Sequence, residues 1–210
     1  MSPEATSKFI TFEGGEGAGK TTQCQALLKR LRQRGMVVLL TKEPGGTPFG
    51  HGIRMWLKGT RRERIVPEAE LFLFLASRAQ LASQVIRPAL LRGEVVICDR
   101  YTESTYAYQG YGRGIDREAI GIMNKVATEG LSSDLVVLLD VPPELGLTRT
   151  GNDYFQREGL EFHRRVRQGY LDMAAREGER WLVVDAALPP GEVSEIVWGR
   201  VRRMLEGKGG

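Results

Sequence analysis

Eight residues near the N-terminus constrain this chain more than any other segment. Residues 14–21 read GGEGAGKT and match the pattern G-x-x-x-x-G-K-[ST] without a mismatch. The segment lies between an apolar run at residues 9–12 and a helical pattern, so it joins a strand to a helix. Backbone N–H groups of such a glycine-rich turn surround phosphate oxygens, and the following helix adds the positive end of its dipole. The sequence therefore predicts a phosphate-binding loop (P-loop) that holds a nucleoside triphosphate.

The residue types of this loop suggest individual roles. Lys20 can reach the β- and γ-phosphates, and the Thr21 hydroxyl can bind Mg²⁺. We expect the rest of the loop to surround ATP, through Gly14, Gly15, Glu16, Gly17, Ala18, Gly19 and Thr22.

Apolar runs alternate with longer helical patterns along the whole chain. We expect strands at residues 8–12, 36–41, 94–98, 134–140 and 181–185. The third and fourth are continuously apolar, which is typical of strands covered on both faces in a parallel sheet. The prediction is a doubly wound α/β fold, in which a five-stranded parallel sheet carries helices on both faces. Residues 1–210 are expected to form one domain, with a frayed tail at residues 207–210.

Composition limits the classes of function to be considered. The 210 residues carry a net charge of +4, and 23 of the 30 basic residues are arginine. Arginine suits phosphate recognition, although a general composition bias explains the excess equally well. The chain shows no secretory signal, no apolar run of transmembrane length, and no metal-ligand pattern at Cys24 and Cys98. We expect a cytoplasmic protein with no nucleic-acid or membrane partner.

An acidic residue follows the apolar run at residues 95–98. Ligands of parallel sheets bind beyond the carboxyl ends of the strands. Asp99 can therefore hold Mg²⁺ through water, and the adjacent Arg100 can bind a phosphate. The alternative is that Asp99 only caps the next helix.

Two further segments carry residue types that suit a nucleotide. The sequence EPGGT at residues 43–47 follows the second predicted strand, but alone it predicts only a tight loop. Phe74 and Arg78 are four residues apart on a predicted helix, so they share a face and could contact a base. A core helix would explain the same apolar stretch. Phe72 is rotated off that face, and we expect it in the core.

In order and spacing these segments resemble the thymidylate kinase family, the dTMP kinases among the P-loop nucleoside monophosphate kinases. The resemblance extends from about residue 8 to residue 205, and its matching segments are residues 12–23, 43–50, 74–81, 99–110, 138–149 and 160–171. It implies the nucleoside monophosphate kinase type of the P-loop NTPase fold. It also implies ATP-dependent phosphorylation of dTMP to dTDP with Mg²⁺, and a homodimer packed through helices.

The resemblance further implies roles for individual residues. Phe74 and Arg78 would contact thymine, Arg100 would bind the acceptor phosphate, and Glu16 would lie near the sugar 3′-hydroxyl. The full set implied at dTMP is Glu16, Glu43, Pro44, Arg54, Phe74, Arg78, Arg100, Ser104, Thr105, Tyr108 and Gln109.

A short lid at about residues 149–159 departs from the family's pattern. Family members carry a catalytic arginine in the P-loop or in the lid, and Gly17 occupies the P-loop position here. Tyr154 and Gln156 stand where the family has Arg and Glu. Arg149 is therefore the first candidate for the catalytic arginine, and Arg157 is the second.

With Arg149 included, the expected catalytic set is Lys20, Asp99, Arg100 and Arg149, with Mg²⁺ held by Thr21 and Asp99. The departure in the lid leaves two alternatives open. The chain could be a nucleotide-binding protein with weak or lost kinase activity, or a kinase for another nucleoside or nucleotide acceptor.

Overall fold

The centre of the molecule is a five-stranded parallel sheet. The computed structural model describes residues 7–58, 65–150, 155 and 158–207. The strand order is β2-β3-β1-β4-β5, and all four neighbouring pairs are parallel. The predicted doubly wound α/β fold is confirmed, and each strand lies within two residues of its expected position. The strands are β1 (Lys8–Glu13), β2 (Val38–Lys42), β3 (Val95–Asp99), β4 (Leu135–Asp140) and β5 (Trp181–Asp185).

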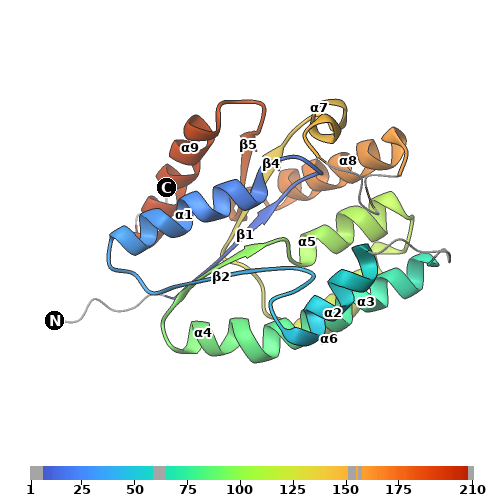
Figure 1. The fold of residues 1–210 in the computed structure, drawn as a ribbon, viewed down its shortest axis with the longest axis horizontal. Helices are drawn as coiled ribbons and strands as arrows, with labels where there is room; N and C mark the ends of the chain where they lie inside the picture. The colour runs from blue at the N-terminus through green and yellow to red at the C-terminus, as the bar shows by residue number, and fades with distance from the viewer. Residues whose placement is uncertain (1–6, 59–64, 151–154, 156–157, 208–210) are drawn as a thin grey trace.

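Helices cover both faces of this sheet (Figure 1). Helices α1 (Lys20–Gln33) and α9 (Pro190–Leu205) pack on one face, where they form the largest core cluster. The other face carries three smaller clusters. Their elements are α3 (Pro67–Leu81), η1 (Ala82–Ile86), α4 (Arg87–Leu91), η2 (Tyr106–Gly112), α6 (Arg117–Thr128) and α8 (Leu160–Arg176).

Strand residues alternate between the two layers. Ile10 and Phe12 of β1 face the α1 and α9 cluster, whereas Phe9 packs with residues of η1 and α4. Because both faces are covered, a central strand needs apolar residues at every position. This requirement explains the unbroken apolar runs of β3 and β4. The remaining short elements are α2 (Pro48–Lys58), α5 (Thr102–Thr105), α7 (Pro143–Thr148) and η4 (Gly178–Arg180).

The expectation that Phe72 belongs to the core is wrong. Leu71 and Leu75 of α3 are buried, but the Phe72 side chain is 58% exposed. One residue along a helix rotates the side chain by about 100°, so Phe72 points away from the face that carries Leu71 and Leu75. An exposed aromatic ring thus lies on the outer side of α3.

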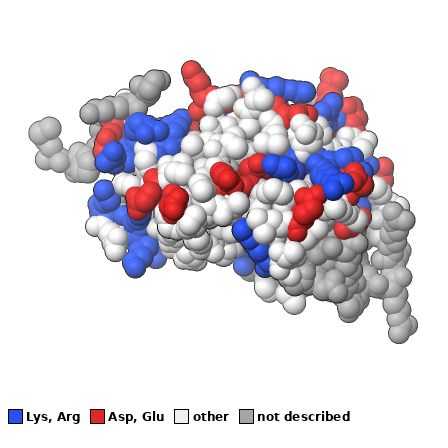
Figure 2. Space-filling model, turned by 90° about the horizontal axis from the view of Figure 1, so that it is seen from above, with Lys and Arg blue, Asp and Glu red and all other residues white. Residues whose placement is uncertain are grey.

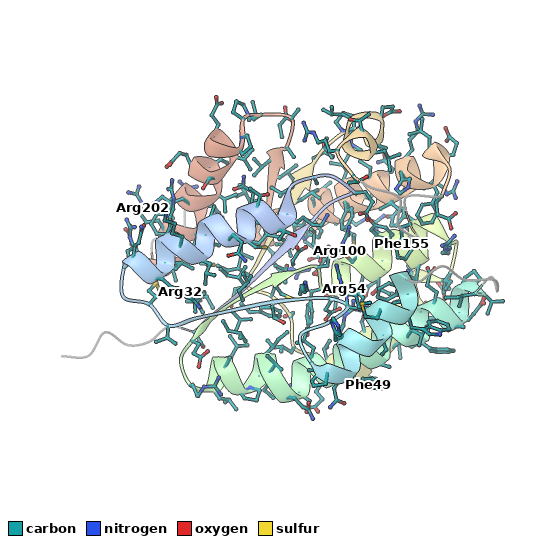
Figure 3. All side chains as sticks on the ribbon, in the orientation of Figure 1. Arg32, Phe49, Arg54, Arg100, Phe155 and Arg202 are labelled. Atoms are coloured by element: carbon teal, nitrogen blue, oxygen red, sulfur yellow. The ribbon has the colours of Figure 1, made fainter. Side chains whose placement is uncertain are left out.

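Charged side chains are interspersed over the face seen in Figure 2, and Lys and Arg gather toward the end where α1 and α9 finish. Arg32 and Arg202 lie at that end (Figure 3). None of the helices in the described part of the chain has the length and apolar character to cross a membrane. Most of the predicted lid lies outside the described residues, including Tyr154, Gln156 and Arg157, as does most of the expected tail.

Candidate functional site

A cavity of about 320 Å³ opens at the carboxyl edge of the sheet. Figure 3 shows Arg54 of α2, Arg100 and Phe155 close together in this region. Gly14, Gly15 and Arg149 are the predicted site residues that do not border the cavity. All the others do: Glu16, Gly17, Ala18, Gly19, Lys20, Thr21, Thr22, Glu43, Pro44, Arg54, Phe74, Arg78, Asp99, Arg100, Ser104, Thr105, Tyr108 and Gln109.

The P-loop curls around the ammonium group of Lys20. Its Nζ donates to the carbonyl oxygens of Gly14 (3.1 Å) and Gly15 (2.7 Å), which fixes the side chain along the loop. Burial and the nearby Arg100 lower the pKa of Lys20 to about 8, while Glu16 opposes this shift. The ammonium form still dominates at pH 7, so the loop presents a cation to an incoming phosphate.

Gly17 is confined by Gly146 of α7. Its φ is +67°, and a Cβ built there would overlap with the carbonyl group of Gly146. A Cβ at Gly146 would in turn overlap with the carbonyl oxygen of Glu16. The P-loop therefore has no room for an arginine at position 17. This packing gives a physical reason for the glycine that stands there.

A hydroxyl and a carboxylate form a possible metal position at the edge of the loop. Thr21 Oγ1 donates to Asp99 Oδ2 at 2.6 Å. Hard oxygen ligands of this kind suit Mg²⁺, which completes its shell with phosphate oxygens and water. Asp99 does not cap the next helix, because α5 begins at Thr102 and has no side-chain cap. The chemistry of these two residues thus fits a magnesium ion.

Arg100 occupies the middle of the cavity wall. Its Nη2 donates to Glu16 Oε1 (2.7 Å) and to the Tyr108 hydroxyl (3.0 Å), and its Nη1 reaches the carbonyl oxygen of Gly14 (3.1 Å). Burial opposes ionisation of Glu16, but Arg100 and Lys20 outweigh it and lower its pKa to about 2. Arg100 is also one of two described non-glycine residues with positive φ, at 75°. The contacts of its guanidinium offset a backbone conformation that costs about 1–2 kcal/mol.

Sequence reasoning missed a carboxylate beneath Arg100. Glu13, the last residue of β1, is fully buried and accepts hydrogen bonds from the Tyr101 N–H (2.6 Å), the Ser104 hydroxyl (2.6 Å) and the Tyr170 hydroxyl (3.0 Å). Arg100 Nη1 lies 3.2 Å from Ser104 Oγ and 3.3 Å from the Tyr170 hydroxyl. Burial, together with Glu103, raises the pKa of Glu13 to about 7. The available signal in the sequence was a charged residue, Glu13, that directly follows the apolar run at residues 9–12.

Arg78 is held by acceptors from four segments. Its Nε donates to Glu43 Oε2 (2.8 Å), its Nη1 to Thr105 Oγ1 and Asn124 Oδ1 (both 2.6 Å), and its Nη2 to the carbonyl oxygen of Tyr101 (2.9 Å). The side chain is 1% exposed, and Glu43 also forms an ion pair with Nη2 at 2.7 Å. This network joins the EPGGT loop, α3, α5 and α6 at the floor of the cavity.

Three aromatic rings enclose the cavity beside Arg78. The Phe155 ring lies 6.0 Å from the ring of Phe74 and 5.1 Å from that of Tyr108, measured between centroids. Phe155 was not predicted, because it lies in the short lid where no regular pattern marks it. Gln109 also borders the cavity, and its Nε2 donates to the buried Glu70 at 2.8 Å. The arrangement offers flat apolar surfaces next to fixed polar groups, which suits a nucleobase.

Arg149 lies at the end of α7, and its Nη1 donates to the carbonyl oxygen of Ala186 at 3.0 Å. In the described conformation its side chain contacts the loop after β5 and does not border the cavity. The second candidate, Arg157, lies outside the described residues.

A P-loop that opens beside a base-sized cavity, with arginines between the two, defines a nucleotide-dependent phosphotransferase of the P-loop class. Comparison with known proteins gives the family. The model for the family described as thymidylate kinase matches residues 12–197.

Individual relatives agree over nearly the whole chain. A thymidylate kinase of Thermomicrobium roseum is 50% identical and covers 95% of this chain and 97% of its own length. A thymidylate kinase of Solidesulfovibrio magneticus is 48% identical and covers 94% of this chain and 100% of its own length. The crystal structure of thymidylate kinase from Ehrlichia chaffeensis aligns with a TM-score of 0.77 at 33% identity, over 93% of this chain and 98% of that one. The chain belongs to the thymidylate kinase family, and it uses ATP to phosphorylate dTMP.

Proposed function

We propose that the cavity of about 320 Å³ holds dTMP and that the P-loop holds the phosphates of ATP. The observation that carries this assignment is the position of Arg100, which contacts the P-loop through Gly14 and the cavity wall through Tyr108. A phosphate bound at Arg100 would lie between donor and acceptor. In-line transfer requires this placement, because the acceptor oxygen must approach the γ-phosphorus opposite the leaving group.

Each end of the acceptor would meet a distinct set of groups. We place thymine between Phe74 and Arg78, with Thr105 and Gln109 along its polar edge. Ser104, Tyr108 and Glu16 would line the sugar, and Arg54 would approach the acceptor phosphate from α2. Glu43 and Pro44 complete this wall, since Arg54 Nη1 donates to the carbonyl oxygen of Pro44 at 3.3 Å.

Catalysis would depend on charge rather than on proton transfer. The acceptor phosphate is already an anion, so no strong general base is needed. Lys20 and Arg100 would stabilise negative charge that spreads over the transferred group, and Glu16 keeps Arg100 oriented through the 2.7 Å contact. Arg149 remains our first candidate for the lid arginine, which requires its side chain to leave the Ala186 carbonyl.

We propose Mg²⁺ as the metal cofactor, held by Thr21 directly and by Asp99 partly through water. The ion would neutralise charge between the β- and γ-phosphates. The 2.6 Å contact between the two side chains supports this placement. Thr21→Val is expected to raise the magnesium concentration needed for half-maximal rate at least tenfold, whereas Thr148→Val is the control, because Thr148 is exposed at the end of α7 and does not border the cavity. An unchanged magnesium dependence in Thr21→Val would contradict the assignment.

We also propose a homodimer that acts in the cytoplasm. Phe72 of α3, together with Ile122 and Val126 of α6, leaves large apolar side chains exposed on two helices that pack side by side. Large exposed apolar side chains on neighbouring helices are typical of a protein interface. Two buried cysteines without a disulfide, Cys24 and Cys98, agree with a reducing compartment. We expect no nucleic-acid partner.

The experiment that tests this function is a coupled assay over a panel of acceptors, with ATP and Mg²⁺. We expect dTMP to give the highest kcat/KM among dTMP, dUMP, dCMP, UMP and thymidine. A higher value for another acceptor would contradict the substrate assignment. Binding of ATP without turnover on any acceptor would favour the alternative of a nucleotide-binding protein with weak or lost activity.

A further inference from the structure

A second cavity, of about 490 Å³, lies on the other side of α5 and α6 from the first. It is bordered by residues of α5, α6 and the end of α8, and it shares no lining residue with the cavity at the P-loop. Among the residues that border it are Tyr106, Asn124, Lys125 and Arg176. The proposed acceptor site leaves this second cavity without a role.

The lining carries an excess of positive charge. Its carboxylates are Glu103 and Glu177, and both form ion pairs with Arg180. That arginine is therefore neutralised within the protein. Lys125 and Arg176 are exposed, and neither has a carboxylate within 4.0 Å among the described residues, although Arg176 helps to lower the pKa of Asp172 one turn earlier on α8. The cavity thus presents Lys125 and Arg176 as cations that a bound anion could neutralise, and Arg117 is a third cation on its border.

A buried amide between the two cavities has an unused donor. Asn124 is 4% exposed, and its Oδ1 accepts from Arg78 Nη1 at 2.6 Å. This contact fixes the orientation of the amide, because a guanidinium only donates hydrogen bonds. The Nδ2 group is left as a buried donor without a hydrogen-bond partner in the described structure. A ligand with an acceptor at this point would relieve the cost of burying that group.

An aromatic surface completes the cavity. Tyr106 borders it, and Gly121 of α6 approaches so closely that a Cβ there would lie 2.9 Å from the Tyr106 hydroxyl. The ring of Tyr111 also faces the cavity, with the guanidinium of Arg117 above it at 4.7 Å from the centroid. Flat rings, an amide donor and unpaired cations are the groups that a base and its phosphates would use together.

We propose that this second cavity binds a nucleoside phosphate and that this binding changes the affinity of the protein for its acceptor. The phosphates would lie at Lys125 and Arg176, and the base would lie between Tyr106 and Asn124. The coupling runs through Asn124, which contacts Arg78 in the first cavity, and this part of the inference rests on the proposed function. Coupling of this kind is reciprocal, so dTMP would equally change the affinity of the second cavity.

The first test is equilibrium dialysis with each of the four common deoxynucleoside triphosphates as probe, in the presence of saturating dTMP and ADP. We expect at least one probe to bind with a stoichiometry near one per chain. Inorganic tripolyphosphate should bind at least tenfold more weakly than that probe. No binding of any probe would overturn the proposal, as would equal affinity for tripolyphosphate, since the cavity would then be only an anion site.

The second test is the double variant Lys125→Glu with Arg176→Glu. Binding of the probe should fall at least tenfold, while kcat and KM without the probe stay within twofold of the wild type. Lys29→Glu with Arg203→Glu is the matched control, because these exposed cations lie on α1 and α9. Unchanged probe binding in the double variant would overturn the location of the site.

The third measurement addresses the coupling. The probe should change the KM for dTMP at least threefold in the wild type, and this change should disappear in the double variant. A change that persists in the double variant would arise at the first cavity and would refute the coupling. Normal kinase turnover without probe binding would refute this inference alone, whereas absent turnover on dTMP would refute the proposed function.

Discussion

Gly17 of the P-loop and Gly146 of α7 pack backbone against backbone. Neither position has room for a Cβ, since each would overlap with a carbonyl group of the opposite segment. Helix α7 leads to Arg149, the first residue of the predicted lid. The contact that excludes an arginine from the P-loop therefore also anchors the segment from which a lid arginine would come.

Gly146→Ala should disturb both segments at once. The added methyl group would collide with the carbonyl oxygen of Glu16, and overpacking of this kind costs about 1–3 kcal/mol. We expect a lower melting temperature and a raised KM for ATP. Gly191→Ala is the matched control, because a Cβ at this helical glycine meets nothing within 4 Å. Equal melting temperatures for the two variants would contradict the close packing.

Arg100→Met should remove most of the catalytic rate. Loss of one arginine that stabilises the transferred phosphoryl group can reduce kcat by about 10³. Initial rates with saturating ATP and dTMP give the comparison, and Arg203→Met on the exposed side of α9 serves as control. A kcat within tenfold of the wild type would show that Arg100 is not at the reacting phosphates.

Glu13 should make stability depend on pH. Burial raises the pKa of Glu13 to about 7 from the 4.5 of an unperturbed glutamate, so the folded state holds a proton that the unfolded state releases first. Its contribution to the free energy of unfolding is complete below pH 4.5 and is lost as the pH rises to about 7. Glu13→Gln mimics the protonated form and should reduce the fall in melting temperature between pH 5 and pH 8.

Measurement by calorimetry at several pH values separates this effect from those of other groups. Glu16 serves as the contrast. Its pKa is lowered to about 2, so this carboxylate stays ionised throughout the range. Glu16→Gln should leave the slope between pH 5 and pH 8 unchanged, even though it lowers activity. A slope unaltered in Glu13→Gln would mean that Glu13 stays ionised in the folded protein.

Arg149→Ala tests the assignment of the lid arginine. If this side chain leaves Ala186 and reaches the phosphates, its loss should lower kcat by about 10³ or more. Arg164→Ala is a suitable control, since its guanidinium pairs with Glu144 at the surface. Retention of kcat within threefold would assign Arg149 to binding or structure and leave Arg157 as the candidate.

Phe72→Glu should weaken the proposed dimer. A carboxylate at the centre of an apolar interface is left without a partner, which costs several kcal/mol of association free energy. Sedimentation equilibrium should show the wild type as a dimer and the variant shifted toward the monomer. Leu91→Glu is the control, because Leu91 is 82% exposed on α4, away from α3 and α6. A monomeric wild-type protein would refute the dimer outright.

The sequence predicted the sheet well because its strands carry local signals. Two covered faces require unbroken apolar runs, and the P-loop and Asp99 mark the edge at which strands β1 and β3 end. The resemblance to the family also assigned Glu43, Pro44 and Arg78 to one acceptor site, and these residues border the same cavity. The expectation for Phe72 failed because periodicity gives the faces of a helix but not which of them is covered.

Other parts of the site depend on contacts that no local pattern encodes. Glu13 meets Tyr170 across 157 positions of the chain, and only the folded sheet brings β1 and α8 together. The same holds for the contact of Gly17 with Gly146. The sequence shows both glycines, but nothing in it indicates that they touch. Asn124 lies on a helix that the nucleotide motifs do not include, so its link to Arg78 could not be foreseen.

The network around Arg78 has a consequence for selectivity. An arginine has five N–H bonds, and each one here faces an acceptor supplied by the protein: Glu43 twice, Thr105, Asn124 and Tyr101. The side chain loses its conformational entropy when the protein folds, so binding a base does not have to order it again. The cavity floor is therefore a rigid template. If this cavity is the acceptor site, as proposed, such a template would discriminate bases by shape and by the penalty of a misplaced polar group, more than by any hydrogen bond newly gained.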